Sequence, residues 1–167
     1  MAATIFKTES VESFKSKLIK LGFNLFPAYR RTGGRICFLS NDWRDVHVKL
    51  KLTWKTKNYV GTVFGGSIYG AVDPIYMIQL INILGKDFVV WDKSANIYFL
   101  KPVKSAVYAR FQITNEILEE IRHKINADKK YVINLPVEFL DKDGVVYAKV
   151  EKAIYIAEKG YYKNKKG

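Results

Sequence analysis

Residues 66–84 form an apolar run near the middle of the chain, and this run limits the folds open to it. As a helix it has no polar stripe, so it must be buried on nearly all sides. The run contains Asp73 and Pro74, and its apolar character extends back to about residue 60. A charge near the middle of a lone membrane span costs about 2.5–3.5 kcal/mol on insertion scales. We therefore expect a buried helix of a folded domain and no membrane span.

Alternating hydrophobicity predicts strands on both sides of this helix. In residues 45–54 every second residue is apolar, which predicts a strand with one polar face that carries His47 and Lys49. A hairpin turn is indicated by the Asp and Gly residues at 141–144. The predicted strands are residues 35–39, 45–54, 88–100, 105–113, 131–140 and 145–156.

An amphipathic helix is expected near the start of the chain, over residues 8–21. Thr8 or Ser10 serves as its N-cap, and Gly22 ends it. Residues 24–34, with a proline and a glycine pair, are expected to be irregular. The apolar stripe of the helix consists of Phe14, Leu18 and Leu21.

The order of the elements predicts an α+β architecture, in which an antiparallel β-sheet wraps around a long central α-helix. A second amphipathic helix over residues 114–125, capped by Thr114 or Asn115, interrupts the strands as an additional surface helix. No linker or repeat divides the chain, so residues 1–167 are expected to form one domain. Its parts are an N-terminal helix and loop (1–34), a core (35–159) and a basic tail (160–167).

Composition excludes several classes of protein. The chain has 167 residues, of which 49% are hydrophobic and 26% charged, as in one globular domain. Its one cysteine, Cys37, rules out an intrachain disulfide and a cysteine-based zinc site, and it is expected to be a small core residue. Residues 1–5 show no secretory signal, so we expect a cytoplasmic protein.

The net charge of +12 is concentrated early in the chain, where residues 1–60 hold 12 Lys and Arg against 4 Asp and Glu. Such a field attracts phosphates of nucleic acid, anionic lipid or a phosphorylated cofactor, although a solvated basic surface explains it equally well. No nucleic-acid motif is present, so we do not expect a nucleic-acid partner. His47 and His123 lack partners at triad or metal spacing, and Gly33-Gly34 lacks the spacing of a phosphate loop. We expect no metal site.

One motif lies where the polar connection enters the apolar run. Asn58 stands six residues before Phe64, Gly65 and Gly66 follow directly, and Asp73 stands nine residues after Phe64. This pattern resembles the hotdog-fold thioesterases of the phenylacetate type, and residues 92–102 resemble the next strand of that family. The resemblance covers about residues 45–113 and implies a hotdog core over residues 35–159, in a thioesterase-like branch of uncharacterised function.

The resemblance implies an acyl-CoA thioesterase that works on acyl thioesters. Asp73 is then the general base or the nucleophile, Asn58 positions the water or the carbonyl, and Asp92 assists the attacking water. The Gly65 amide, at a helix N-terminus, is the expected oxyanion donor. Each residue also has a structural interpretation. Asp73 could bond nearby backbone, Asn58 could form a turn, Asp92 could pair with Lys93, and the glycines could permit a sharp turn.

One residue departs from the family pattern, because Phe64 replaces the family's histidine and cannot donate a hydrogen bond. The alternative is therefore a non-catalytic protein that binds acyl-CoA or an acyl chain. The resemblance also implies a site between subunits, hence a homodimer or homotetramer, and no cofactor apart from coenzyme A within the substrate. The expected substrate-binding residues are Phe64, Gly66, Lys101 and Lys104, with Arg110 near the two lysines.

Overall fold

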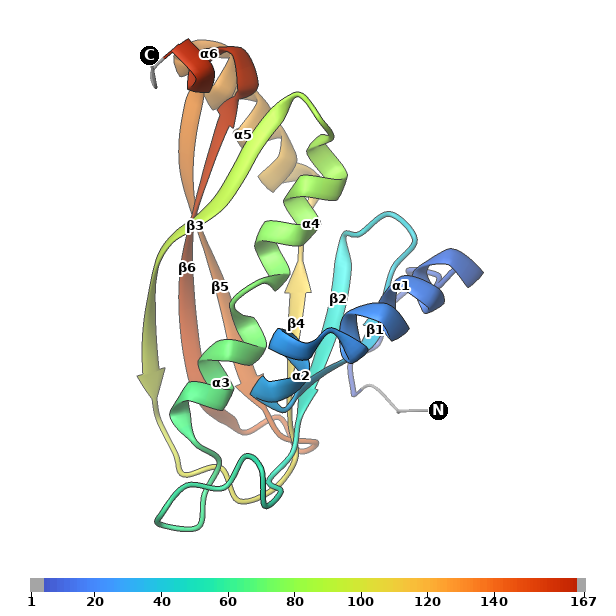
Figure 1. Ribbon diagram of the computed structural model, residues 1–167, viewed down its shortest axis with the longest axis vertical. Coiled ribbons are helices and arrows are strands. Elements are labelled where there is room, and N and C mark those ends of the chain that lie inside the picture. Colours follow the sequence, from blue (N-terminus) through green and yellow to red (C-terminus); the bar gives the residue numbers. More distant parts are fainter. Residues whose placement is uncertain (1–4, 165–167) are drawn as a thin grey trace.

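The computed structural model describes residues 5–164; residues 1–4 and 165–167, which include the end of the expected basic tail, lie outside the described part. Its centre is one six-stranded antiparallel sheet with the order β1-β2-β4-β5-β6-β3, which curves around a helix (Figure 1). The strands are β1 Gly34–Leu39, β2 Asp45–Leu50, β3 Phe88–Phe99, β4 Val107–Gln112, β5 Lys130–Leu140 and β6 Val146–Glu158. The helices are α1 Phe14–Leu25, α2 Pro27–Thr32, α3 Gly65–Val72, α4 Ile75–Leu84, α5 Asn115–Asp128 and α6 Lys159–Asn164. The predicted α+β class and the six strands are confirmed.

The central helix is kinked rather than continuous, and the kink separates α3 from α4. Pro74 lacks an amide hydrogen and its ring crowds the preceding turn, so the helix breaks beside it. Asp73 is the last residue bonded to α3, through its amide and the Tyr69 carbonyl (2.9 Å). By length and hydropathy the run Gly65–Leu84 is the one candidate membrane span in residues 5–164, but its inner side is built into the core of the fold.

One side of the central helix stays open, which differs from the expectation of burial nearly all round. Tyr69 and Ile81 are exposed along this side. The inner side packs against the sheet and is buried at Ile68, Ala71, Val72, Ile75, Tyr76 and Leu80. The sheet's two edges are β1 and β3, and β3 pairs only with β6 among the described residues. An open apolar edge and an open helix side leave this part of the fold suited to a partner.

The N-terminal region differs from the predicted helix and loop. Ser13, rather than Thr8 or Ser10, caps α1 by accepting a hydrogen bond from the Ser16 amide (3.1 Å), so the helix starts later. It also runs through Gly22 to Leu25. The expected irregular segment contains α2, because proline at a first helical position is compatible with the helix backbone.

The apolar stripe of α1 is a second difference, because Phe14, Leu18 and Leu21 are exposed instead of buried. The helix turns its other side to β1 and α2, where Ser16 is buried and Ile19 and Phe23 pack against the core. The strongest apolar face of α1 therefore has no partner within residues 5–164.

The predicted polar face of β2 is also wrong at His47, which is fully buried. The rings of Phe6 and Phe38 cover it, with centroid distances of 5.0 and 4.7 Å. Its Nε2 donates to Asp45 (2.9 Å), which is buried as well. The strand ends at Leu50, four residues earlier than predicted.

The remaining predicted helices and strands agree closely with the structure. Thr114 caps α5 by accepting from the Ile117 amide, and α5 packs on β5 and β6. Cys37 is a buried core residue. The expected tail from residue 160 starts instead within α6, which extends the end of β6.

Candidate functional site

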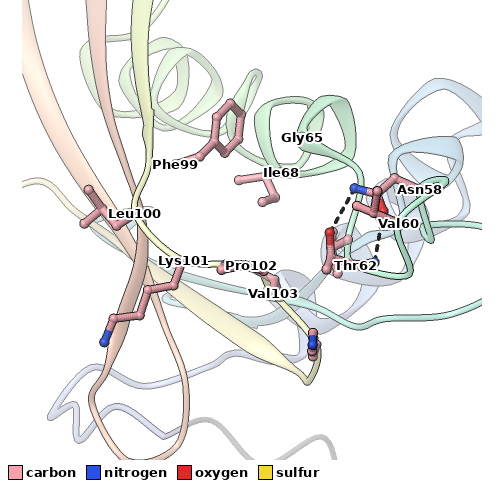
Figure 2. A pocket seen from close by; sticks show the side chains of 12 residues that line it. Asn58, Val60, Thr62, Gly65, Ile68, Phe99, Leu100, Lys101, Pro102 and Val103 are labelled. Carbon is pink, nitrogen blue, oxygen red and sulfur yellow. Dashed lines mark hydrogen bonds between the residues drawn. The ribbon is translucent and has the colours of Figure 1, made fainter.

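The predicted helix N-terminus opens onto a cavity of about 610 Å³ (Figure 2). Gly65 and Ile68 of α3 form one wall, and the segment after β3 forms the opposite one. Lys101 and Lys104 lie in that segment. The cavity therefore combines apolar walls, a helix N-terminus and two cations, a set suited to an anionic ligand with an apolar part.

Gly65 and Gly66 begin α3, so their amides have no acceptor within the helix. Space here is limited: a Cβ on Gly65 would lie 2.8 Å from the ring of Phe99, and one on Gly66 would lie 2.3 Å from the ring of Phe64. The missing side chains leave the Gly65 amide accessible at the cavity wall. Phe64 is more than half exposed, and neither it nor Gly66 is among the residues that line the cavity.

Asn58 lines the cavity but is engaged in its own loop. Its Nδ2 donates to the Thr62 hydroxyl (2.9 Å), and its Oδ1 accepts from the Thr62 amide (2.9 Å). Gly61, with φ of 83°, completes this turn. The turn orders the loop that leads into α3, and Nδ2 of Asn58 carries a second proton that it can donate to a ligand.

Asp73 lies at the kink of the central helix within a charged cluster. The ammonium of Lys152, on β6, lies 3.2 Å from Asp73 Oδ1 and 3.2 Å from Asp92 Oδ2. It also lies 5.3 Å from the centre of the Tyr69 ring. Lys152 is fully buried, whereas the side chain of Asp73 is 48% exposed. One oxygen of Asp73 is thus fixed by Lys152, and the carboxylate still reaches solvent.

Asp92 is the less exposed of the two carboxylates in this cluster, with 20% of its side chain exposed. Its Oδ1 has no hydrogen-bond partner within residues 5–164. Burial raises the pKa of Asp92, an effect that Lys152 opposes and the charge of Asp73 reinforces. The β-bulge between Asp92 and Ser94 turns β3 at this point.

Lys152 is the residue that the sequence analysis missed, although a signal was present. Along β6 every second residue faces the core, and Lys152 stands among Val150, Ile154 and Ile156 on that buried face. A lysine on the buried face of an alternating strand requires a counterion. The pattern could therefore have predicted a buried acidic partner.

The structure divides six of the predicted site residues into two groups, and Phe64 and Gly66 belong to neither. Asn58, Gly65, Lys101 and Lys104 line the cavity, whereas Asp73 and Asp92 meet at Lys152. The two groups lie at opposite ends of α3, about 12 Å apart along the axis for eight residues of helix.

Arg110 belongs to neither group, contrary to its expected place near the two lysines. Its guanidinium donates two hydrogen bonds to Asp45 (2.9 and 2.8 Å). Asp45 also accepts from the hydroxyl of Thr8 (2.6 Å). This network attaches the segment before α1 to β2 and β4.

A second cavity, of about 340 Å³, lies beside Asp73. Its walls come from α2 and from the two central helices, and they are mostly apolar. Phe26, Ala28, Met77 and Ile78 supply much of this lining. We call it the Asp73 groove.

Solved structures with the same arrangement come from several bacteria. A protein of unknown function from Pseudomonas aeruginosa, described as a probable thioesterase, aligns with a TM-score of 0.74 and 16% identity over 86% of this chain and 95% of its own. A protein of unknown function from Chlorobaculum tepidum aligns with a TM-score of 0.67 and 18% identity over 87% of this chain and 95% of its own. A thioesterase from Haemophilus influenzae aligns with a TM-score of 0.62 and 14% identity over 90% of this chain and 96% of its own. A search of curated proteins found no match.

At these identities the likeness concerns the fold, and it defines the class: a sheet wrapped around a central helix in the hotdog arrangement. The predicted hotdog fold is confirmed. Within this class the chain belongs to the family described as domain of unknown function DUF4442, whose profile matches residues 16–156.

Proposed function

We propose that the protein hydrolyses acyl thioesters, with acyl-CoA as the expected substrate class, at a site built from two copies of the chain. One observation carries this proposal: the central helix presents free amides at Gly65 and a half-exposed carboxylate at Asp73, at opposite ends of α3. An oxyanion donor and a base must lie within hydrogen-bond reach of one thioester. About 12 Å of helix separates them in one chain, so the complete site needs the partner's Asp73.

The fold favours such a pairing. Strand β3 is an open edge, and apolar side chains are exposed along its second half and at the start of α3. Two-fold symmetry places identical surfaces together, so two β3 edges would pair antiparallel and run the central helices in opposite directions. The Gly65 end of one helix then faces the Asp73 end of the other. The exposed residues are Phe64, Tyr98, Phe99 and Leu100.

The chemistry follows from this placement. Lys101 and Lys104 attract the phosphates of the thiol carrier, and the Gly65 amide donates to the carbonyl oxygen as it gains negative charge. Asp73 takes a proton from water, whose oxygen bonds to the carbonyl carbon; the carbon–sulfur bond then breaks, and the thiolate leaves and is protonated. Direct attack by Asp73 would instead give a mixed anhydride that water hydrolyses. Lys152 positions the carboxylate in both versions. The acyl group lies in the Asp73 groove, because its apolar walls reach that carboxylate.

The test measures thiol release from short, medium, long and aryl acyl-CoAs. Asp73→Asn should abolish release. Gly65→Pro should reduce it about 10²–10³-fold, the usual effect of losing one oxyanion donor. Proline suits the first turn of a helix, and Phe64 has the extended backbone (φ −63°, ψ 131°) that can precede it. Gly65→Ala is the matched control, since it adds a Cβ but keeps the amide.

A second candidate function is binding of acyl-CoA without hydrolysis, and Phe64 at the family's histidine position favours it. Under this alternative a folded, oligomeric protein binds acyl-CoA and releases no thiol from any substrate. A gain of hydrolysis in Phe64→His would then identify the missing group. Substantial release by Asp73→Asn would refute the role given to that carboxylate.

A further inference from the structure

The open face of α1 is a continuous apolar stripe on the surface of the molecule. Its side chains are 53% to 77% exposed, a degree of exposure that is unusual for large hydrophobic residues in such a cluster. The spacing alternates between three and four residues, which keeps them on one side of a helix. Within α1 the stripe comprises Phe14, Leu18, Leu21 and Leu25; Val11 precedes the helix, and Phe26 continues the stripe into the turn before α2.

Positive charge flanks the helical part of this stripe, and the one carboxylate within the span of the stripe, Glu12, pairs with Lys20. Residues 13–41 contain six Lys and Arg and no Asp or Glu. Lys15 and Lys17 are exposed beside the stripe. At its end, Arg30, Arg31 and Lys55 line a depression of about 460 Å³ together with Leu25, again with no acidic residue in the lining.

Amphipathic helices with these two features lie in the surface of anionic membranes. Their apolar side chains enter the boundary between headgroups and acyl chains, and flanking lysines and arginines contact lipid phosphates. A second copy of the chain fits less well. Pairing of two α1 helices through the stripe would bring the lysines and arginines of both copies together, and residues 13–41 hold no carboxylate to pair with them. The charge pattern therefore favours lipid as the occupant.

We propose that α1 binds the surface of an anionic membrane, with its apolar stripe inserted and the depression at Arg30, Arg31 and Lys55 holding a lipid phosphate. The position of α1 is compatible with the proposed pairing of subunits. It packs on β1, one edge of the sheet, whereas β3 is the other edge (Figure 1). Both copies of a β3-paired dimer would thus keep α1 free. The proposal does not depend on catalysis.

The test is sedimentation of the full chain with vesicles of phosphatidylcholine alone and with phosphatidylglycerol added. We expect binding to the phosphatidylglycerol vesicles that falls steeply with salt, and little binding to phosphatidylcholine. Lys15→Glu/Lys17→Glu should weaken it at least tenfold. Arg122→Glu/Lys124→Glu, on the exposed side of α5, makes the same change in net charge and should have a much smaller effect.

A second variant tests the apolar stripe itself. Phe14→Ser/Leu18→Ser replaces exposed side chains, so circular dichroism should show an unchanged fold while vesicle binding is lost. The proposal is overturned if the wild type does not bind anionic vesicles, or if the α1 and α5 charge reversals weaken binding equally. It is also overturned if this variant only dissociates an oligomer in analytical ultracentrifugation, because the stripe would then join copies of the chain.

Discussion

Lys152 shows how a single buried charge can order a candidate site. Its ammonium is the counterion of two carboxylates, of which Asp92 is 20% exposed and Asp73 48% exposed. Removing one partner of a buried ion pair leaves the other charge uncompensated, which is more destabilising than losing the whole pair. The cluster therefore fixes the position of Asp73 at a kink where the helix backbone alone does not.

We predict that Lys152→Met lowers the free energy of unfolding by about 3–5 kcal/mol, because it leaves the mostly buried carboxylate of Asp92 without its counterion. Lys152→Met/Asp92→Asn should recover part of this loss, since the amide carries no charge. Urea unfolding of both variants and the wild type measures the effect. A loss below about 1 kcal/mol in the single variant would show that the pair does not matter for stability.

Asp45 makes stability depend on pH. Burial alone would raise the pKa of Asp45, but hydrogen bonds from His47, Arg110 and Thr8 hold it well below its usual value of 3.8. A carboxyl group whose pKa is lower in the folded state than in the unfolded state stabilises the fold at pH values above the unfolded-state pKa. This stabilising contribution is lost as the pH falls toward the pKa of the group in the folded state.

We therefore expect the free energy of unfolding of the wild type to fall between about pH 5 and pH 2, and Asp45→Asn to be less stable at pH 7 but flatter over this range. Denaturant titrations at several pH values provide the comparison. Parallel curves for the two proteins would contradict the role given to Asp45.

At the scale of elements, periodicity predicted the fold well where one pattern dominates. Five of the strands and α5 follow their sequence patterns, because burial on one face decides them; β2, which is also buried at His47, is the exception. The central helix was expected from residues 66–84, and Pro74 then accounts for its kink.

The predictions that the structure corrects share a physical cause, because each depends on tertiary contacts that a local sequence pattern does not show. His47 is covered by Phe6 and Phe38, which a local pattern does not reveal. Helix α1 turns a weaker face inward and leaves its apolar stripe outside. The candidate site was predicted as one set of residues, but its division into two groups depends on where α3 begins and ends.

The groove between α2 and the central helices yields a prediction on substrate length. Met77 lines the Asp73 groove, and a larger side chain there would fill part of its 340 Å³. We expect Met77→Trp to reduce kcat/KM for long acyl-CoAs at least tenfold while short ones are hydrolysed as before. Met77→Ala, the matched control, should keep or extend the range of acyl-chain lengths that the protein hydrolyses. An equal loss for all chain lengths in Met77→Trp would place the acyl group elsewhere.

At the scale of the whole molecule, the two edges of the sheet have different proposed roles. In these proposals the β3 edge would pair two chains and complete their sites, and α1 on the β1 edge would face the membrane. A dimer of this kind would act on acyl thioesters at the surface where apolar acyl chains gather. The expected cytoplasmic location remains a prediction that this arrangement accommodates.

Mixing two inactive variants tests the shared site most directly. Asp73→Asn keeps the Gly65 amide, and Gly65→Pro keeps the carboxylate, so a mixed dimer has one intact site and one that lacks both groups. After the subunits are unfolded together and refolded, we predict about a quarter of wild-type thiol release, because half of the dimers are mixed and each has one working site. Each variant refolded alone is the control. If the mixture stays as inactive as its components while wild type treated in the same way recovers, Gly65 and Asp73 of different chains do not act on one thioester.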